Sequence, residues 1–384
     1  MAMMKKIQKG LAWTVGRLLP IQKNKIVVSS YYGRGYSDNP KAVVDALLRR
    51  NEDLDIVWLA KDPEHAGVPA GVRVVCHDTA AAIRELSTAH VWIDNCRKGA
   101  RHKKAKQYYM QTWHGFALKR IERDVADKLN TPENAAYAVY AQRDSSQIDV
   151  IISDSTFMTD IYRHSFWYDG EIQQFGSPRN DILASPPAHA KETIAKALHL
   201  PADSNYVMYA PTFRADGSLD AYQLDYEAVC DACSKRFGGN WIMLVRLHPN
   251  VMQLAKDMTF DNRTTFDATA FDDMQLLLSA CNAVITDYSS LMFDFALTRR
   301  PCFQFATDID DYKNDRNFYF PIDETPFPLA KSNAEMVQTI ESFDELSYQT
   351  ECDAFFEKMG FVLDGKASDQ CADWILQRMH KSCK

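Results

Sequence analysis

Short apolar runs alternate along this chain with stretches whose apolar residues recur at helical spacing. Runs this short and continuous are typical of strands that are buried on both faces, and alternation with helices predicts parallel sheets. The sequence therefore predicts an α/β protein. The runs lie at 25–30, 56–59, 72–75, 91–93, 108–112, 149–153, 206–210, 241–245, 283–285 and 301–305.

The pattern of strands and helices starts afresh after a connection that contains Ser185, Pro186 and Pro187. A length of 384 residues suits two domains, and a hydrophobic content of 46% is enough for a core in each. We expect a Rossmann-like domain at 23–184, a second one at 185–350, and a helix within 351–384 that crosses back to the first domain. The helical pattern of that last segment runs from Phe355 to Met379.

The first residues, 1–22, have a separate character. Five apolar residues recur there at helical spacing, with Lys and Arg between them, and the first 37 residues contain no acidic residue. Two interpretations are a basic amphipathic helix on an anionic membrane surface, which we favour, and a helix docked on the protein itself. The apolar residues are Met4, Ile7, Leu11, Val15 and Leu18.

Charge and cysteine content narrow the class of protein further. The net charge of −7 argues against nucleic acid as a partner. Nine cysteines without paired spacing suit a reducing cytosol, and the one CxxC, Cys230 to Cys233, has no second pair, so we interpret it as structural. No apolar run reaches 18 residues, so no membrane span is expected. These features favour a cytoplasmic protein that is peripheral on the inner face of the cell membrane.

Polar and cationic residues follow three strands of the second half. In open parallel sheets, ligands collect at the carboxyl ends of strands, and a helix N-terminus attracts phosphate. Ser289 and Ser290 are suited to capping the helix that begins at Leu291, so this turn is either a phosphate cradle or an ordinary capped helix. Three such ends in one domain favour an anion site. They carry Thr212 and Arg214, then Arg246 and His248, then Thr286, Asp287, Ser289 and Ser290.

The first half places His114 and Gly115 after the strand at 108–112. A histidine there can accept or donate a proton near neutral pH, and glycine allows close approach of a substrate. The alternative is a buried histidine that is satisfied by a backbone carbonyl. The basic run 97–106 is either a solvated loop or a surface that attracts phosphate or lipid, and Arg179 is presented by a turn.

Six motifs then occur in order across nearly the whole chain. Together they resemble those of the CDP-glycerol glycerophosphotransferase family, which includes teichoic-acid primases and polymerases and their capsule relatives. The motifs are YSDNPK at 36–41, QTWHGFALK at 111–119, GSPRND at 176–181, YAPTFR at 209–214, RLHP at 246–249 and TDYSSLMFD at 286–294.

The resemblance implies a GT-B-like fold, in which two Rossmann-type parallel-sheet domains face a cleft. It implies transfer of glycerol phosphate from CDP-glycerol to a hydroxyl of a lipid-linked glycan acceptor, with release of CMP. His114 would be the general base and His248 would contact the donor diphosphate. The residues implied to bind substrate are Gly115, Lys119, Arg179, Thr212, Arg214, Arg246, Thr286, Asp287, Ser289 and Ser290.

Three alternatives stay open at this point. Arg316 precedes Asn317, whereas family members often have Arg-Gly in this loop, so CDP-ribitol is a second candidate donor. A hexosyltransferase of the same fold would use another nucleotide sugar, and an idle relative would only bind glycan. The length is closer to that of the family's primases than to that of its larger polymerases. We expect no metal and no cofactor, because the cations at the strand ends suffice to balance a departing CMP.

Overall fold

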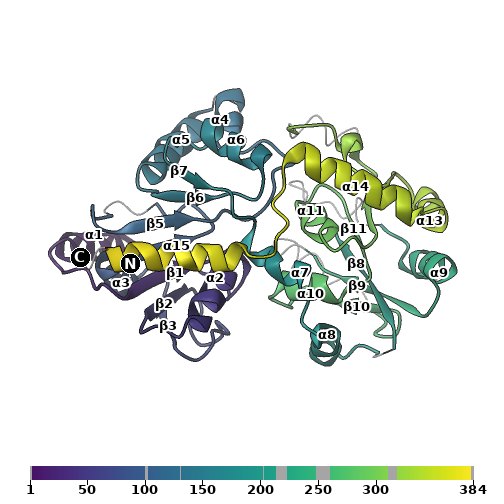
Figure 1. Ribbon diagram of the computed structural model, residues 1–384, viewed down its shortest axis with the longest axis horizontal. Helices are drawn as coiled ribbons and strands as arrows, with labels where there is room; N and C mark the ends of the chain where they lie inside the picture. Colours follow the sequence, from purple (N-terminus) through teal and green to yellow (C-terminus); the bar gives the residue numbers. More distant parts are fainter. Residues whose placement is uncertain are drawn as a thin grey trace. The chain divides into compact units, whose positions relative to one another are not determined.

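The computed structural model describes residues 2–99, 103–129, 131–201, 203–212, 223–247, 260–309 and 318–381. The chain forms two compact units (Figure 1). The first comprises Met1–His114, Ile121–Asp181 and Phe361–Lys384, and the second comprises Gly115–Arg120 and Ile182–Gly360. The chain thus passes from one unit to the other immediately after His114.

The described part of the first unit contains a seven-stranded parallel sheet, with the order β3-β2-β1-β4-β5-β6-β7. The interior strand β1 is fully buried along its apolar residues Ile26, Val27 and Val28, as expected for a strand covered on both faces. The strands are β1 (Lys25–Ser29), β2 (Asp55–Ala60), β3 (Val72–Cys76), β4 (Val91–Asp94), β5 (Tyr108–Gln111), β6 (Val150–Ile152) and β7 (Glu171–Gln173).

Helices surround this sheet, and several begin at a hydroxyl residue whose side chain accepts a backbone N–H. Ser155, for example, accepts a bond from the N–H of Met158 at the start of α6. The helices are α1 (Ala2–Gly16), α2 (Asp38–Arg49), α3 (Ala80–Thr88), α4 (Arg123–Leu129), α5 (Pro132–Ser145), α6 (Thr156–Ser165) and α15 (Ala367–Lys381), with a short 3-10 turn η1 (Pro178–Asn180).

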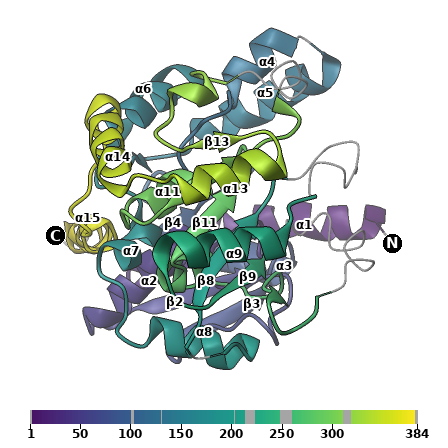
Figure 2. The same cartoon turned by 90° about the vertical axis from the view of Figure 1, so that its right-hand side faces the viewer.

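The described part of the second unit contains a six-stranded parallel sheet, with the order β10-β9-β8-β11-β12-β13. Figure 2 shows α9 and α13 in front of its strands. The strands are β8 (Asn205–Ala210), β9 (Trp241–Val245), β10 (Thr265–Asp267), β11 (Ala283–Thr286), β12 (Cys302–Phe305) and β13 (Leu329–Ala330). The helices are α7 (Asp181–Ala184), α8 (Ala190–Leu198), α9 (Tyr226–Phe237), α10 (Met274–Ala280), α11 (Leu291–Ala296), α13 (Asn333–Glu341) and α14 (Glu345–Met359), with the turn η5 (Ile322–Glu324).

The prediction of one helix from Phe355 to Met379 is wrong. The structure has two helices here, because α14 ends at Met359 and Gly360 follows with a φ of +66°, which suits glycine. The residues between the two helices, from Phe361 on, belong to the first unit, where Phe361 forms an isolated antiparallel β-bridge with Ser155. Helix α15 packs on α2, and Trp374, Ile375 and Met379 share the core of the first sheet.

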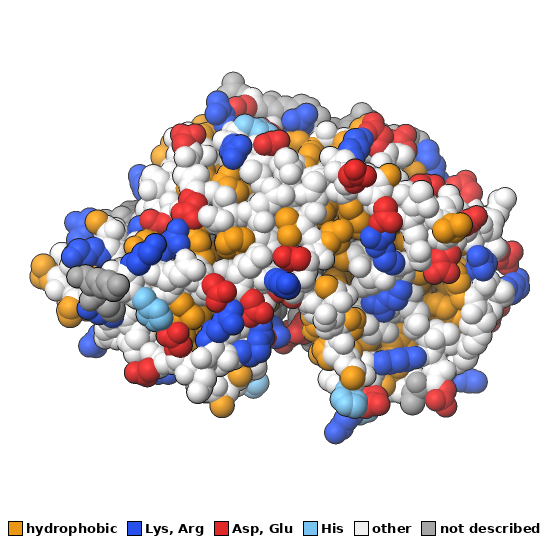
Figure 3. All heavy atoms as spheres, viewed as in Figure 1, with side chains coloured by type: hydrophobic (Ala, Val, Ile, Leu, Met, Phe, Trp, Pro, Cys, Tyr) orange, Lys and Arg blue, Asp and Glu red, His pale blue; other side chains and the backbone are white. Residues whose placement is uncertain are grey.

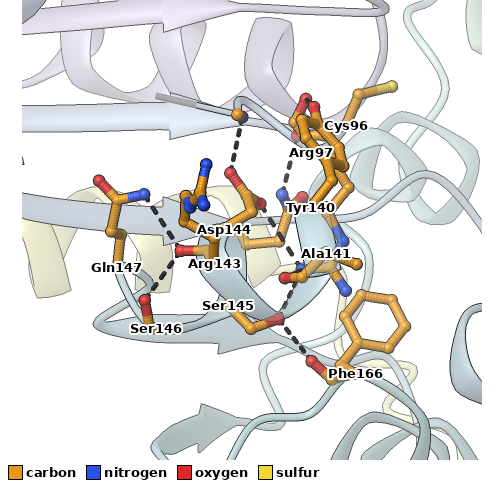
Figure 4. Close-up of polar contacts among 12 residues, drawn as sticks. Cys96, Arg97, Tyr140, Ala141, Arg143, Asp144, Ser145, Ser146, Gln147 and Phe166 are labelled. Carbon is orange, nitrogen blue, oxygen red and sulfur yellow. Dashed lines mark hydrogen bonds and ion pairs between the residues drawn. The ribbon is translucent and has the colours of Figure 1, made fainter. Parts of the chain in front are cut away.

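A second prediction changes at the basic run 97–106. Arg97 is not solvated, because its side chain is only 2% exposed and lies in a polar cluster (Figure 4). Its guanidinium donates to Glu122 at 2.7 Å and to Ser145 at 2.6 Å, and lies 3.5 Å from Asp144. This cluster fastens the α4–α5 pair to the sheet. Residues 100–102 of the run lie outside the described residues.

Candidate active site

The carboxyl ends of the parallel strands of the first unit meet at one edge of the sheet, and His114 lies there, three residues after β5. Its imidazole stacks on Trp113, with ring centroids 4.3 Å apart, and lies 5.6 Å from the ring of Tyr31. Trp113 has a φ of +49° and Gly115 a φ of +145°, so the backbone turns sharply on both sides of His114.

The protonation state of His114 follows from these surroundings. Burial is the main influence and lowers the pKa to about 4, Asp38 opposes this shift, and Arg179 adds to it. The side chain still keeps partial exposure to solvent. A neutral imidazole at pH 7 has a free nitrogen lone pair, which is the form that a general base requires.

Arg179 lies beneath the backbone of His114. Its Nη1 donates to the carboxylate of Asp38 at 2.6 Å and to the carbonyl of His114 at 2.8 Å. The Arg179 side chain is 6% exposed and that of Asp38 is 5% exposed, so the ion pair is buried. The predicted cation is therefore found next to the predicted base, in the same unit.

Sequence reasoning gave no role to Asp38 and Asn39, which the structure places under the same turn. Asp38 begins α2 with a φ of +65°. Asn39 is 1% exposed and donates to the carbonyls of Thr112 and Trp113. Their position at the start of a helix, within the motif at 36–41, is the signal that could have identified them from the sequence.

Gly115 and Lys119 lie in the segment Gly115–Arg120, which is part of the second unit. Phe116 anchors this segment, because it is 2% exposed and its ring lies 4.6 Å from that of Phe293. Lys119 pairs with Phe318 in an isolated antiparallel bridge, and its Nζ lies 5.9 Å from the centroid of the Tyr288 ring. Lys119 is thus brought beside the turn at 286–290.

That turn follows β11 at the carboxyl edge of the second sheet. The Thr286 hydroxyl donates to the carbonyl of Ala210 at 2.6 Å, and Asp287 accepts from the N–H of Thr212 at 2.8 Å. Both side chains are buried and join β11 to the end of β8. Thr212, Thr286 and Asp287 are therefore brought together, as the pattern of strand ends predicts.

The expected capping by two serines is only half correct. The Ser289 hydroxyl accepts a bond from the N–H of Leu291 at 3.3 Å. Ser290 occupies the N-cap position of α11, but its φ of −61° and ψ of −14° are helical and its side chain makes no capping bond. Both serines are partly exposed at this edge, and α11 itself is short.

The other residues of the second half that the sequence predicts to contact substrate divide into two groups. Arg246, directly after β9, donates through Nη1 to the carbonyls of Ala268 and Phe271, so its guanidinium braces the chain after β10. Arg214, His248 and the Arg316 loop lie outside the described residues. Among the described side chains, no group of His, Cys, Asp and Glu is arranged to hold a metal ion.

Two all-parallel α/β sheets, each with polar residues gathered at its carboxyl edge, define a GT-B-like protein. Comparison with known proteins then assigns the family. The chain belongs to the CDP-glycerol:poly(glycerophosphate) glycerophosphotransferase family, whose model matches residues 11–377.

Relatives with described activities cover the chain along its length. A teichoic acid poly(glycerol phosphate) polymerase of Staphylococcus epidermidis is 32% identical over 95% of this chain, which spans about half, 51%, of that relative. A teichoic acid glycerol-phosphate transferase of Staphylococcus aureus is 28% identical over 92% of this chain and 93% of its own length. The structure of the wall teichoic acid polymerase TagF has a TM-score of 0.87 and 29% identity, covering 99% of this chain and 95% of that one. A TagF variant has also been soaked with CDPG.

Proposed function

We propose that this protein transfers glycerol phosphate from CDP-glycerol to a hydroxyl of a lipid-linked teichoic-acid acceptor and releases CMP. The observation that carries the proposal is the position of the His114 imidazole, stacked on Trp113 at the carboxyl edge of the first sheet, in a chain of this family. The CDPG soaked into TagF and the glycerol-phosphate activities of the relatives support the choice of donor.

The reaction needs one proton acceptor and a place for negative charge. The acceptor hydroxyl oxygen attacks the phosphorus that carries glycerol, the bond from that phosphorus to the CMP oxygen breaks, and His114 takes the hydroxyl proton. CMP leaves with the bonding electron pair. Phosphoryl transfer relies mainly on positioning and charge compensation, which suits a site built from strand ends.

We assign the donor to the carboxyl edge of the second sheet. Ser289, Ser290 and Lys119 supply polar groups there, beside the strand ends joined by Thr212 and Asp287. Arg214, Arg246 and His248 carry the cationic and proton-donating chemistry that balances the charge on the departing CMP phosphate. CDP-glycerol is favoured over CDP-ribitol because the relatives above act in glycerol-phosphate synthesis.

The acceptor's lipid points to a membrane partner, and α1 has a suitable surface. One face of α1 packs on α3. Beyond it, hydrophobic side chains are exposed: Ile7 by 61%, Leu11 by 64% and Val15 by 49%, with Leu18 exposed by 86% just after the helix. In Figure 3, basic and hydrophobic side chains lie together at this end of the first unit. We therefore infer that this surface rests on an anionic membrane, at its inner face. Across the described residues, no helix is both long and apolar enough to span a bilayer.

The experiment that tests the proposed function measures CMP release. Purified protein is incubated with CDP-glycerol and, in parallel, with CDP-ribitol, each with and without a lipid-linked disaccharide acceptor. Acceptor-dependent CMP release from CDP-glycerol is the expected result, and product mass gives the number of units added. Release from CDP-ribitol alone would replace the donor, and silence with both donors from folded protein would overturn the proposal.

A further inference from the structure

Three successive backbone carbonyls at the end of β5 are each held by a buried side chain. The side-chain amide of Asn39 donates to the carbonyl of Thr112 at 3.2 Å and to that of Trp113 at 3.0 Å. The guanidinium of Arg179 donates to the carbonyl of His114 at 2.8 Å. Few backbone groups beyond the end of a strand have a ladder partner, so these bonds, together with the one from the Trp113 N–H to the Gln111 side chain, hold the turn in its course.

The two donors are themselves joined into one unit. The Asn39 Oδ1 accepts the backbone N–H of Arg179 at 2.9 Å, so the amide bridges the β5 turn and the η1 turn. Arg179 also pairs with Asp38, the residue before Asn39, at 2.6 Å. The motifs at 36–41 and 176–181 therefore meet beneath the motif at 111–119.

The carboxylate of Asp38 is saturated with hydrogen bonds. Its Oδ2 accepts from Arg179 and from the Tyr31 hydroxyl at 2.7 Å, and its Oδ1 accepts from the Asn39 N–H at 2.7 Å and the Asn95 amide at 3.0 Å. Burial by itself raises the pKa of Asp38, but Arg179 and these hydrogen bonds hold the pKa below its ordinary value. A charged, fully bonded carboxylate fixes the direction of the guanidinium.

The turn that these residues hold is a strained one. Trp113 has a φ of +49°, a strained conformation for a bulky side chain, which persists only where neighbours enforce it. Its ring stacks on the imidazole of His114. Releasing the carbonyls of Thr112 and Trp113 would let this turn relax and carry the imidazole away from its place.

We propose that Asn39 and the Asp38–Arg179 pair are positioning residues, which hold the His114 imidazole in its reactive place. Arg179 thereby acts on the base through its carbonyl and does not bind the donor phosphates. This inference rests on the proposed function, because it concerns the general base of that reaction. It also changes the role that sequence alone suggests for Arg179, namely substrate binding.

The test uses two variants and a matched control. Asn39→Ala removes the two bonds that the amide donates and the acceptor of the Arg179 N–H. Asp38→Asn together with Arg179→Met removes the bond to His114 without leaving a buried charge unpaired, which protects the fold. Asn24→Ala is the control, because Asn24 is exposed and its amide also donates to a backbone carbonyl, that of Asp53.

Three quantities are measured: kcat, affinity for CDP-glycerol by calorimetry, and the titration of the His114 imidazole by NMR. A displaced base should lower kcat by about tenfold to a hundredfold and leave CDP-glycerol affinity within about twofold. In Asn39→Ala, which keeps the charges of Asp38 and Arg179, the pKa of His114 should rise from about 4 toward the ordinary 6.5, as the imidazole moves toward water. The control should change none of the three.

Two results would overturn the inference: an unchanged kcat and titration in both variants, or a loss of CDP-glycerol affinity as large as the loss of kcat. The His114 titration and the calorimetry need no turnover, so they separate this inference from the proposed function. If His114→Ala retains transfer, the base role fails. If His114→Ala is inactive while Asn39→Ala keeps full kcat, only the positioning role fails.

Discussion

The carboxylate of Asp287, at the end of β11, accepts a hydrogen bond of 2.8 Å from the backbone N–H of Thr212, at the end of β8. The same oxygen accepts the N–H of Tyr288 at 2.6 Å, and Asp287 is 1% exposed. Adjacent strands diverge beyond their last ladder bond, so this buried carboxylate, together with the Thr286 hydroxyl, keeps these two ends together. Asp287 therefore shapes the edge at which we place the donor.

Replacing Asp287 by alanine should leave these two backbone N–H groups without their acceptor. We expect the free energy of unfolding to fall by about 1–3 kcal/mol, with weaker CDP-glycerol binding because the Thr212 end loosens. Urea unfolding at pH 7 and calorimetry check both effects. Asp267→Ala is the control: this exposed carboxylate on β10 also accepts a backbone N–H, from Thr269, and its loss should cost less. Equal losses in the two variants would contradict a special role for Asp287.

The sequence predicted the central strands well, because a strand buried on both faces must be continuously apolar. Strands β1, β8 and β9 illustrate this, since every hydrophobic residue in them is buried. The short strands β7, β10 and β13 escaped notice. All three lie at the edge of a sheet. Strands β7 and β10 have three residues each, β13 has two, and the sequence of β10 is Thr-Phe-Asp. Such segments owe their conformation to the neighbouring strand and not to their own pattern.

The motifs at strand ends could also be predicted from the sequence, since the position of His114 after β5 follows from the strand itself. The interaction partners of the side chains could not be predicted. Arg179 pairs with Asp38 across 141 positions of sequence, and Arg300, which follows α11, donates to carbonyls at the end of α10, among them that of Ser279. Contacts this distant depend on how elements pack, which local patterns do not contain.

His114→Ala should abolish transfer and leave CDP-glycerol binding nearly intact, because the role we propose for His114 is to take the proton of the acceptor hydroxyl and not to bind the donor. In the unaltered enzyme the pKa of about 4 means that raising the pH through 4 frees the imidazole lone pair. The acid limb of kcat/KM, which reports the free protein, should therefore lie near pH 4. A rate profile and calorimetry test this prediction, with the exposed His189→Ala as control. An acid limb near 6.5, or loss of donor binding, would contradict it.

Arg97→Met should be strongly destabilising, because it leaves Glu122 and Asp144 buried without their cation. A loss of about 3–5 kcal/mol is typical for a broken buried ion pair. Arg73→Met is the control: this arginine is 48% exposed and pairs with Asp55, so its loss should cost about 1 kcal/mol or less. Urea unfolding compares the two variants.

The damage in Arg97→Met should also depend on pH. Burial raises the pKa of Asp144 although Arg97 opposes the shift, so removing Arg97 raises it further. An acid whose pKa is raised on folding loses stability as the pH increases, since its ionised form is the disfavoured one. The deficit relative to the unaltered protein should therefore be larger at pH 8 than at pH 5. A deficit independent of pH would mean that Asp144 is not the group left uncompensated.

Membrane attachment through α1 predicts a loss of vesicle binding when its exposed apolar surface becomes charged. Leu11 and Leu18 are exposed in the free protein, so replacing both with glutamate should leave the unfolding transition unchanged. Burying a leucine in the bilayer interface contributes about 1.5 kcal/mol or more, so the pair should weaken binding by about a hundredfold. Sedimentation with phosphatidylglycerol-containing vesicles measures this affinity. Because Lys and Arg accompany the apolar face, added salt should weaken binding of the unaltered protein as well.

The control for the double variant is Leu346→Glu, since Leu346 is 76% exposed on α14 of the other unit. Undiminished binding of the double variant would place the membrane contact on another surface.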